Sequence, residues 1–377
     1  MENIDLARDR AWIEINLNNL ENNINEIKKL LSEETKIMAV VKANAYGHGS
    51  VIIAKKLLDI GITDFAVATL DEGIELRKNG ITGNILILGF TNFSNLKYVI
   101  EYDLIQTIVD YNYSERIKEL DLKDKLKCHI KINTGMNRIG ENCDSLDKLY
   151  SIYENKKLNI LGSFSHLCVA DSSNLEDIDF TKIQIKKFNE CVKAIKDKGY
   201  NTGALHLQSS YGIINYNELN YDYVRVGICM YGVNTDFNPY QLNNLNIKPI
   251  LAVKARITSI KEINIDDSIS YGRTFIAKDK MKIATLGIGY ADGIPRCLSN
   301  KDMLVNINEE YKKVIGRICM DQMIIDITGL ENVKVGDIAT LIGNDKRISA
   351  ETVSNKAETI TNELLCRLGS RLRRITI

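Results

Sequence analysis

The sequence predicts a chain of class α/β plus all-β, in which an N-terminal (β/α)8 barrel (a TIM barrel) precedes a C-terminal β domain. Eight short apolar runs alternate with segments of helical spacing over the first two thirds of the 377 residues. Eight strands close such a barrel, which typically takes about 250 residues. After about residue 240, strand-like segments follow one another with few helices between them. We therefore expect a barrel over residues 12–240 and a β domain over residues 241–377.

The predicted barrel strands are apolar runs separated by amphipathic segments. Two of the separating segments, 50–61 and 179–199, have apolar residues at helical spacing and stop at a glycine. Strand and helix in alternation favour parallel strands with right-handed crossovers. An open doubly wound sheet is the alternative, but VKANAYGHG follows the first strand where that fold usually has GxGxxG. The eight runs are 36–41, 65–69, 84–89, 106–110, 128–134, 160–167, 204–210 and 223–232.

The predicted β domain consists of strand-like segments whose turns are rich in Gly, Asp and Asn. A helix or helix pair is expected near the C-terminus. A further strand over residues 8–16 precedes the first barrel helix, and either domain could hold it. The strand-like segments are 250–263, 268–275, 280–293, 303–328 and 337–343.

The composition excludes several classes of protein. With 49 Lys and Arg against 49 Asp and Glu, the chain has no net charge to attract nucleic acid or anionic membranes. No apolar run reaches the roughly 18 residues of a membrane span, and MENIDLARDR is too polar for a secretory signal. The eight cysteines are scattered without a CxxC pair, so we expect free thiols in the cytoplasm and no metal site.

Polar residues follow several of the predicted strands at the face where barrel enzymes have their active sites. Lys42 comes directly after the first strand, where partial desolvation would lower the pKa of its amine and make it a nucleophile. Ser209 and Ser210 follow the seventh strand, and Arg225 and Gly227 end the eighth. This combination suits a phosphorylated cofactor, although Lys42 taken alone could be an ordinary surface lysine.

Four motifs in sequence order carry a resemblance to a known family: AVVKANAYGHG, KINTGMNRIG, ATLGIGYADGIPR and GRICMDQMIIDIT. Together they resemble the alanine racemase family of fold-type III pyridoxal 5′-phosphate (PLP) enzymes, over nearly the whole chain. The resemblance implies a barrel with a C-terminal β domain, PLP as cofactor and a small amino acid as substrate. It also implies a homodimer in which each active site is shared between the two protomers.

The resemblance assigns roles to individual residues. Lys42 matches the lysine that binds PLP covalently and serves as one acid/base group, and Tyr271, in ISYGRTF, matches the second, which the partner protomer supplies. Arg225 matches the residue at the pyridine nitrogen, and His166 matches a residue stacked near the ring. The remaining matches are Tyr46, Ser209, Ser210, Gly227 and Ile228 for cofactor binding, Arg138 and Met320 for the substrate carboxylate, Lys131 for an arginine-positioning lysine that is often carbamylated, and Tyr290 for the substrate entrance.

One position departs from the family pattern. Ser370, in LGSRLRRI, stands where alanine racemases usually have a tyrosine that narrows the pocket. A larger and more polar pocket would accept serine beside alanine. The segments ITNELLCRLGSRLRRI, HLQSSYG and RAWIEI also resemble the catalytic domain of vancomycin-resistance-type serine racemases, which usually carry an N-terminal membrane domain.

We therefore expect a PLP-dependent racemase of serine and alanine that supplies D-amino acids for peptidoglycan precursors. We expect it in the cytoplasm, either free-standing or as the cytoplasmic domain of a membrane-anchored parent. A strict alanine racemase, a PLP-binding carrier and a fold-type III decarboxylase are the alternatives. Carriers lack a β domain, whereas Cys319 would suit a decarboxylase and Tyr271 favours racemisation. We interpret His48 and His206 as structural residues and segment 71–80 as a solvated helix face.

Overall fold

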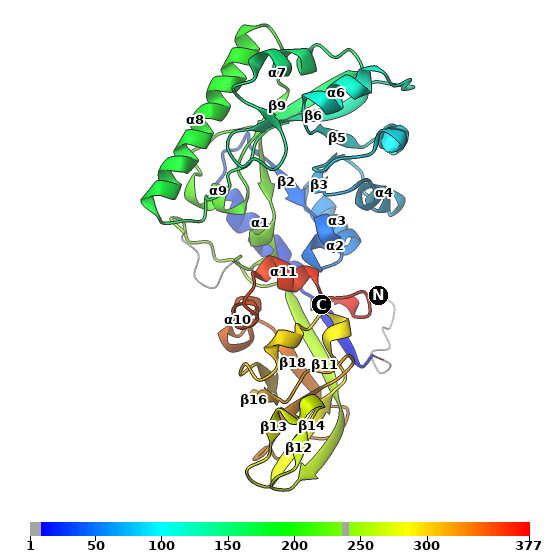
Figure 1. The fold of residues 1–377 in the computed structure, drawn as a ribbon, viewed down its shortest axis with the longest axis vertical. Helices are drawn as coiled ribbons and strands as arrows, with labels where there is room; N and C mark the ends of the chain where they lie inside the picture. The colour runs from blue at the N-terminus through cyan, green and yellow to red at the C-terminus, as the bar shows by residue number, and fades with distance from the viewer. Residues whose placement is uncertain (1–8, 236–240) are drawn as a thin grey trace.

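The computed structural model describes residues 9–235 and 241–377. The expected domain boundary at residue 240 and the first residue of the strand expected at 8–16 lie outside these described residues. The barrel forms one end of the molecule and a β-rich part forms the other, with the C-terminal helix α11 (Thr361–Cys366) between them (Figure 1).

Eight parallel strands close into the predicted barrel, which confirms the TIM-barrel architecture. They are ordered β5-β4-β3-β2-β10-β9-β8-β6, and pairing of β5 with β6 closes the circle. The eighth strand stops at Val226, earlier than the predicted run, because Gly227 and the 3-10 helix η3 (Ile228–Tyr231) turn the chain away. The strands are β2 (Lys36–Val40), β3 (Asp64–Val67), β4 (Asn84–Ile87), β5 (Ile105–Ile108), β6 (Leu126–Asn133), β8 (Leu158–Phe164), β9 (Ala204–His206) and β10 (Tyr223–Val226), and β7 (Glu141–Asn142) extends the sheet beyond β6.

Helices surround the barrel and bury apolar residues against it. The helix predicted over 179–199 is the long α8 (Leu175–Asp197). It begins at Leu175 because the side chain of Asn174 caps it by accepting a hydrogen bond from Glu176 N. The others are α1 (Leu17–Lys28), α3 (Ser50–Asp59), α4 (Leu70–Lys78), α5 (Leu96–Glu101), α6 (Tyr111–Lys118), α7 (Leu146–Tyr153) and α9 (Ser210–Asn215).

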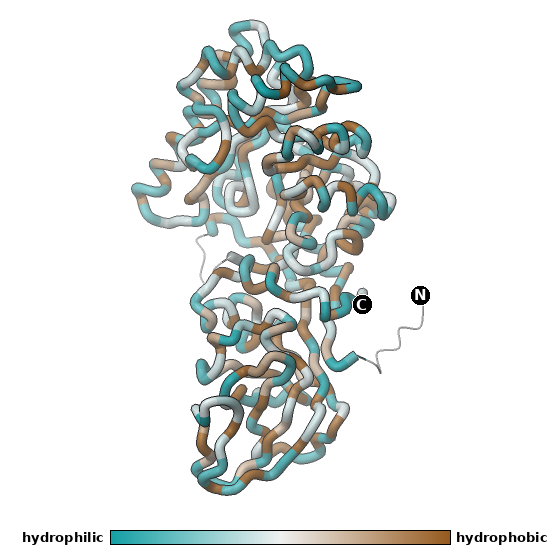
Figure 2. The backbone as a smooth tube through the Cα atoms, turned by 45° about the vertical axis from the view of Figure 1, so that its right-hand side comes forward, coloured by the Kyte–Doolittle hydropathy of each residue, from teal (hydrophilic) through white to brown (hydrophobic). Residues whose placement is uncertain are grey.

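The C-terminal part is built on a sheet ordered β14-β17-β16-β15-β18-β11-β1-β19. The first strand of the described residues, β1, lies in this sheet, antiparallel to β11 and parallel to β19. Hydrophobic stretches run through the interior of both parts of the molecule (Figure 2). The strands are β1 (Ala11–Ile15), β11 (Leu251–Ile263), β14 (Met281–Leu286), β15 (Leu304–Ile307), β16 (Glu310–Ile315), β17 (Met323–Asp326), β18 (Ile338–Ile342) and β19 (Arg373–Thr376), with β12 (Ser268–Ile269) and β13 (Phe275–Ile276) as a separate hairpin.

The C-terminal helix pair, α10 (Ala350–Lys356) and α11, joins the two parts. At the start of α11, Thr361 N donates a hydrogen bond to Thr235 O at 2.9 Å. At its end, the carbonyl of Leu365 packs so closely against Gly47 that an added Cβ there would lie 2.1 Å from the oxygen. Gly47 also has φ +84°, so this contact requires glycine for both space and conformation. The end of the chain therefore covers the loop that follows β2.

Across the part of the chain that the structure describes, no helix has the length and apolar character that would let it cross a membrane.

Candidate active site

Lys42 lies just after the first barrel strand, at the start of a left-handed turn. It opens α2 (Lys42–Tyr46), in which Ala43, Asn44, Ala45 and Tyr46 all have φ of 52–53°. L-residues avoid this conformation at a cost of about 1–2 kcal/mol each, so the turn needs support from its surroundings. The buried His48 provides part of it, because its Nδ1 contacts the carbonyl oxygens of Ala45 at 2.8 Å and Tyr46 at 3.0 Å.

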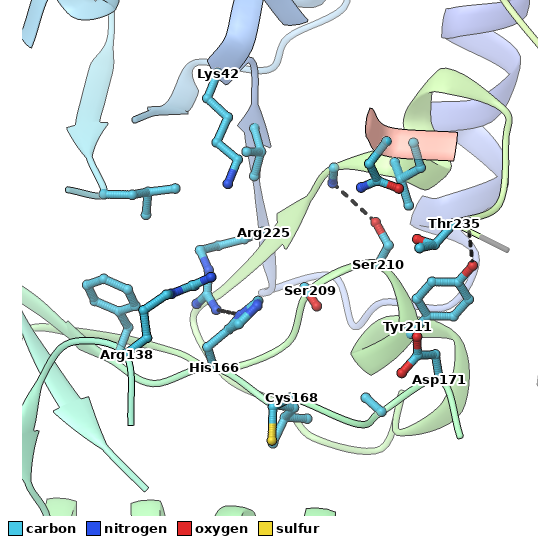
Figure 3. A pocket seen from close by; sticks show the side chains of 18 of the residues that line it. Lys42, Arg138, His166, Cys168, Asp171, Ser209, Ser210, Tyr211, Arg225 and Thr235 are labelled. Carbon is cyan, nitrogen blue, oxygen red and sulfur yellow. Dashed lines mark hydrogen bonds between the residues drawn. The ribbon is translucent and has the colours of Figure 1, made fainter. Parts of the chain in front are cut away.

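A cavity of about 320 Å³ lies at the C-terminal ends of the barrel strands, and the Lys42 side chain points into it (Figure 3). Burial lowers the pKa of the Lys42 amine below its usual value, and the charges of Arg138 and Arg225 lower it further. The cavity is lined by ten residues that the sequence analysis selected: Lys42, Tyr46, Lys131, Arg138, His166, Ser209, Ser210, Arg225, Gly227 and Ile228.

Arg225 anchors a buried network at the base of the cavity. Its Nη1 lies 2.8 Å from Nδ1 of His206, and its Nη2 lies 3.0 Å from Nδ1 of His166 and donates to the Ser165 carbonyl at 2.8 Å. Nε2 of His206 in turn lies 2.8 Å from Nδ1 of His129. The guanidinium is therefore held in one orientation by a partner on the neighbouring strand β9 and by partners in the loop after β8.

The network fixes the protons of these histidines. A guanidinium can only donate, so Nδ1 of His166 and of His206 accept, and both imidazoles carry their proton on Nε2. Burial, followed by the charge of Arg225, lowers the pKa of both rings well below the usual value, so they stay neutral. His206, interpreted from sequence as structural, thus orients Arg225, and Nε2–H of His166 remains a donor.

Lys131 is a buried amine beside the same network. Burial, then Arg225 and Arg138, lower its pKa to about 7. Its Nζ donates to the carbonyl of Ile132 at 3.1 Å and lies 5.3 Å from the centre of the Phe164 ring. A lysine with this pKa is largely neutral just above neutral pH, which makes it a nucleophile.

The opposite end of the cavity presents hydrogen-bond donors around a small space. Ser210 Oγ accepts from the backbone N–H groups of Gly227 and Cys229, both at 3.3 Å. A Cβ built on Gly227 would lie 3.1 Å from the Tyr46 hydroxyl and 3.9 Å from Ser210 Oγ. Burial raises the pKa of Tyr46, so its hydroxyl keeps the proton and can donate. These groups fit a phosphate, and only glycine at position 227 leaves room for one.

Four predicted site residues do not line this cavity. Tyr271, Met320 and Tyr290 are exposed residues of the C-terminal part, with 69%, 53% and 39% of their surface accessible. Ser370 is also exposed, in the turn after α11. Tyr271 lies in the 3-10 helix η4 (Tyr271–Arg273), next to the hairpin β12–β13 at the end of the molecule away from the barrel (Figure 1).

Backbone and side-chain contacts link three of these exposed residues. The hydroxyl of Ser270, which precedes Tyr271, contacts Sγ of Cys319 at 3.3 Å. Tyr290 N donates to Cys319 O at 3.0 Å. Because Met320 follows Cys319, the chain segment at 319–320 brings Tyr271, Tyr290 and Met320 onto one connected surface.

The sequence analysis did not select several of the residues that line the cavity. Phe164 stacks on His206, with ring centres 4.6 Å apart, and contributes the apolar wall beside Lys131. Asn362, on α11, reaches the cavity although Ser370, eight residues later, does not, and its buried Oδ1 has no hydrogen-bond partner among the described residues. The other unpredicted residues include Leu88, Cys168, Asp171, Tyr211 and Thr235.

The sequence is similar to two alanine racemase domains and to several curated relatives. The alanine racemase N-terminal domain matches residues 15–235, and the C-terminal domain matches residues 250–376. An amino-acid racemase of Enterococcus faecalis is 42% identical over 97% of this chain and 51% of the relative. A serine/alanine racemase of Enterococcus gallinarum is 38% identical over 96% of this chain and 51% of the relative. Alanine racemase 2 of Caldanaerobacter subterraneus is 39% identical over 97% of this chain and 94% of the relative.

The chain thus spans about half the length of the two enterococcal relatives and nearly all of the third. Among solved structures, the alanine racemase of Clostridium difficile 630 has a TM-score of 0.92 and 34% identity, over 98% of this chain and 96% of that one. The alanine racemase of Bartonella henselae, solved with covalently bound pyridoxal phosphate, has a TM-score of 0.85 and 29% identity, over 98% of this chain and all of that one. With matches over both parts of the molecule, this chain belongs to the alanine racemase family of PLP-dependent enzymes.

Proposed function

We propose that the protein is a PLP-dependent racemase that inverts serine and alanine at Cα with two bases. One base is Lys42 of the protomer that holds the cofactor, and the other is Tyr271, supplied by the partner protomer. The observation that carries the proposal is one cavity that combines a buried amine, a fixed guanidinium and a phosphate-sized group of donors. These groups fit PLP: the donors around Gly227 suit its phosphate, and Arg225 suits its pyridine nitrogen.

When bound, PLP supplies a conjugated ring that takes up negative charge from the substrate Cα. Tyr46, Ser210 and the backbone near Gly227 would hold the phosphate. Arg225 would face the ring nitrogen and, because a guanidinium does not give up its proton, would leave that nitrogen unprotonated. A weaker electron sink favours return of a proton to Cα over transamination.

Racemisation requires proton transfer on both faces of Cα. Lys42 serves one face, and burial, which lowers the pKa of its amine, favours the neutral form that can accept a proton. A tyrosine has an ordinary pKa of about 10, so a nearby cation must favour its phenolate. His166 is suited to transmit the influence of Arg225, because Arg225 occupies Nδ1 and leaves Nε2–H to donate. The exposure of Tyr271 supports its delivery to the neighbouring protomer.

Arg138 and Met320 of the partner protomer would bind the substrate carboxylate. We include carbamylation of Lys131 in the proposal: its neutral amine attacks CO2, an N–C bond forms and one proton is released, which leaves a carbamate anion. This anion would pair with Arg138 and hold its guanidinium toward the substrate. The pKa of about 7 and the adjacent positive charges of Arg138 and Arg225 support the reaction. Tyr290 of the partner protomer would line the entrance.

Serine beside alanine as substrate is supported by two observations. One relative bears the name serine/alanine racemase. The second is that Ser370 is exposed and does not narrow the cavity, which leaves the polar Asn362 on its wall. A strict alanine racemase is the alternative. We place the proposed activity in the cytoplasm, supplying D-amino acids for peptidoglycan precursors.

The test is incubation of the purified protein with L-serine or L-alanine in D2O, in the presence of PLP. We expect the D-isomer of both, deuterium at Cα and no release of CO2. Turnover of alanine without turnover of serine would indicate a strict alanine racemase, and CO2 release without inversion would reject the racemase.

A further inference from the structure

The carboxylate of Glu72 joins the ends of two adjacent barrel strands. Its Oε1 accepts a hydrogen bond from Ala43 N at 2.6 Å, in the loop after β2. Its Oε2 accepts from Ala68 N at 2.7 Å and Thr69 N at 3.3 Å, in the loop after β3. Each oxygen therefore serves a different loop, and one of these loops begins with Lys42.

This arrangement exceeds what helix capping requires. Glu72 is the third residue of α4, and in a capping box it needs only to reach back to the N-cap residue, Thr69. One oxygen makes that contact, and the second leaves the helix to bind Ala43. The interpretation of segment 71–80 as a solvated face is therefore wrong for Glu72, which is half-buried, although it holds for the exposed Asp71.

The bond to Ala43 lies at the start of the run of left-handed residues that follows Lys42. Ala43 is the first of the four left-handed residues, and its N–H group points away from the barrel ladder toward Glu72. The next support comes from Asn44, whose Oδ1 accepts from Ser50 N at 2.9 Å. The peptide group between Lys42 and Ala43 is thus held by a charged acceptor, which makes a stronger hydrogen bond than a neutral one.

We propose that Glu72 is a positioning residue for Lys42: its carboxylate fixes the peptide after Lys42 and thereby aims the amine into the cavity. The proposal rests on the role of Lys42 as the cofactor lysine.

Glu72 also contributes to the charge balance at the amine. The pKa of Lys42 is lowered by burial, Arg138 and Arg225, whereas Cys366 and Glu72 raise it. Loss of the Glu72 charge therefore lowers the pKa of Lys42 further, and the amine becomes reactive at lower pH. Position and charge are two separable consequences of one carboxylate.

Three variants separate the effect of Glu72 on the position of Lys42 from the effect of its charge. Glu72→Gln removes the charge and leaves one acceptor oxygen, so one loop loses its partner. Glu72→Asp keeps the charge but is one methylene shorter, so it cannot reach both loops. Asp71→Asn is the matched control, because it removes a charge from the same helical turn at an exposed residue that makes no hydrogen bond to Ala43 among the described residues.

The first measurement is PLP affinity, followed by the absorbance of lysine-bound cofactor as PLP is added to the apoprotein. We expect both Glu72 variants to bind PLP at least about tenfold more weakly, the loss typical of a hydrogen bond to a charged group. Asp71→Asn should stay within about twofold of the wild type. Thermal unfolding of each apoprotein verifies that the variants are folded.

The second measurement needs no cofactor: acylation of Lys42 in the apoprotein as a function of pH, quantified by peptide mass spectrometry. Only Glu72→Gln should move the half-reaction point to lower pH. The proposal is overturned if Glu72→Gln matches Asp71→Asn in both measurements. If the wild type itself binds no PLP at Lys42, the proposed function fails, while the acylation profiles still decide whether Glu72 controls the amine.

Discussion

The hydroxyl of Tyr231 donates a hydrogen bond to the carbonyl of Val40 at 2.8 Å, across 191 positions of sequence. Val40 ends the first barrel strand, and Tyr231 belongs to the 3-10 helix that follows the last one. The Tyr231 ring also stacks on His48 at 4.4 Å and packs against Tyr46 at 5.1 Å. The fully buried Tyr231 thus connects the ends of the first and last barrel strands to the turn that carries Lys42.

Replacing Tyr231 by phenylalanine tests this tie. The variant leaves the Val40 carbonyl without this partner in a buried setting, so we expect the free energy of unfolding to fall by about 1–3 kcal/mol. We also expect weaker PLP binding, because Tyr46 loses a fixed neighbour. Urea unfolding and PLP titration measure the two effects. An unchanged unfolding free energy would show that the bond contributes nothing.

Mixing two inactive variants tests whether each active site draws on two protomers. Lys42→Ala should lose the absorbance of lysine-bound PLP, and Tyr271→Phe should lose proton transfer on one face. When the two are unfolded together and refolded, half of the dimers are mixed, and each has one intact site. About one quarter of wild-type activity is then expected. Activity no higher than that of the separately refolded variants would mean that Lys42 and Tyr271 act in the same chain or not at all.

Gly227→Ala tests the phosphate position. The new Cβ would lie 3.1 Å from the Tyr46 hydroxyl and would occupy the space among the donors. We expect PLP affinity to fall by about tenfold, as overpacking of a fitted site typically costs. Gly369→Ala is the control, since its Cβ would meet its nearest atom at an ordinary 3.5 Å. Equal PLP affinity in the two variants would contradict a phosphate at Gly227.

Lys131 should bind CO2 in a pH-dependent manner. Its pKa of about 7 means that the amine is protonated and unreactive below that pH and neutral above it. With 13C-labelled bicarbonate, we expect a carbamate signal by NMR at about pH 8 that is much weaker at about pH 6. The signal should be absent in Lys131→Met. A signal that persists in this variant comes from another amine and removes Lys131 from the proposal.

Much of the barrel was predictable from sequence because parallel strands are buried on both faces and appear as continuous apolar runs. The residues at the ends of these strands, such as Lys42 and Arg225, were predictable because the fold brings all such ends to one face. Contacts between loops were not predictable from the sequence, because no local pattern indicates that Glu72 binds Ala43. Asn362 was missed for the same reason, since the packing of α11 on the barrel depends on both domains.

The contact between Leu365 and Gly47 has a consequence for cofactor loading. Gly47 O also accepts a hydrogen bond from Arg374 Nε at 3.0 Å, so two residues outside the barrel support this loop. The barrel strands by themselves leave the loop beside Lys42 without these two contacts. We expect competence to capture the cofactor to depend on docking of the segment 365–374, which makes correct packing of the second part of the molecule a condition for loading the first.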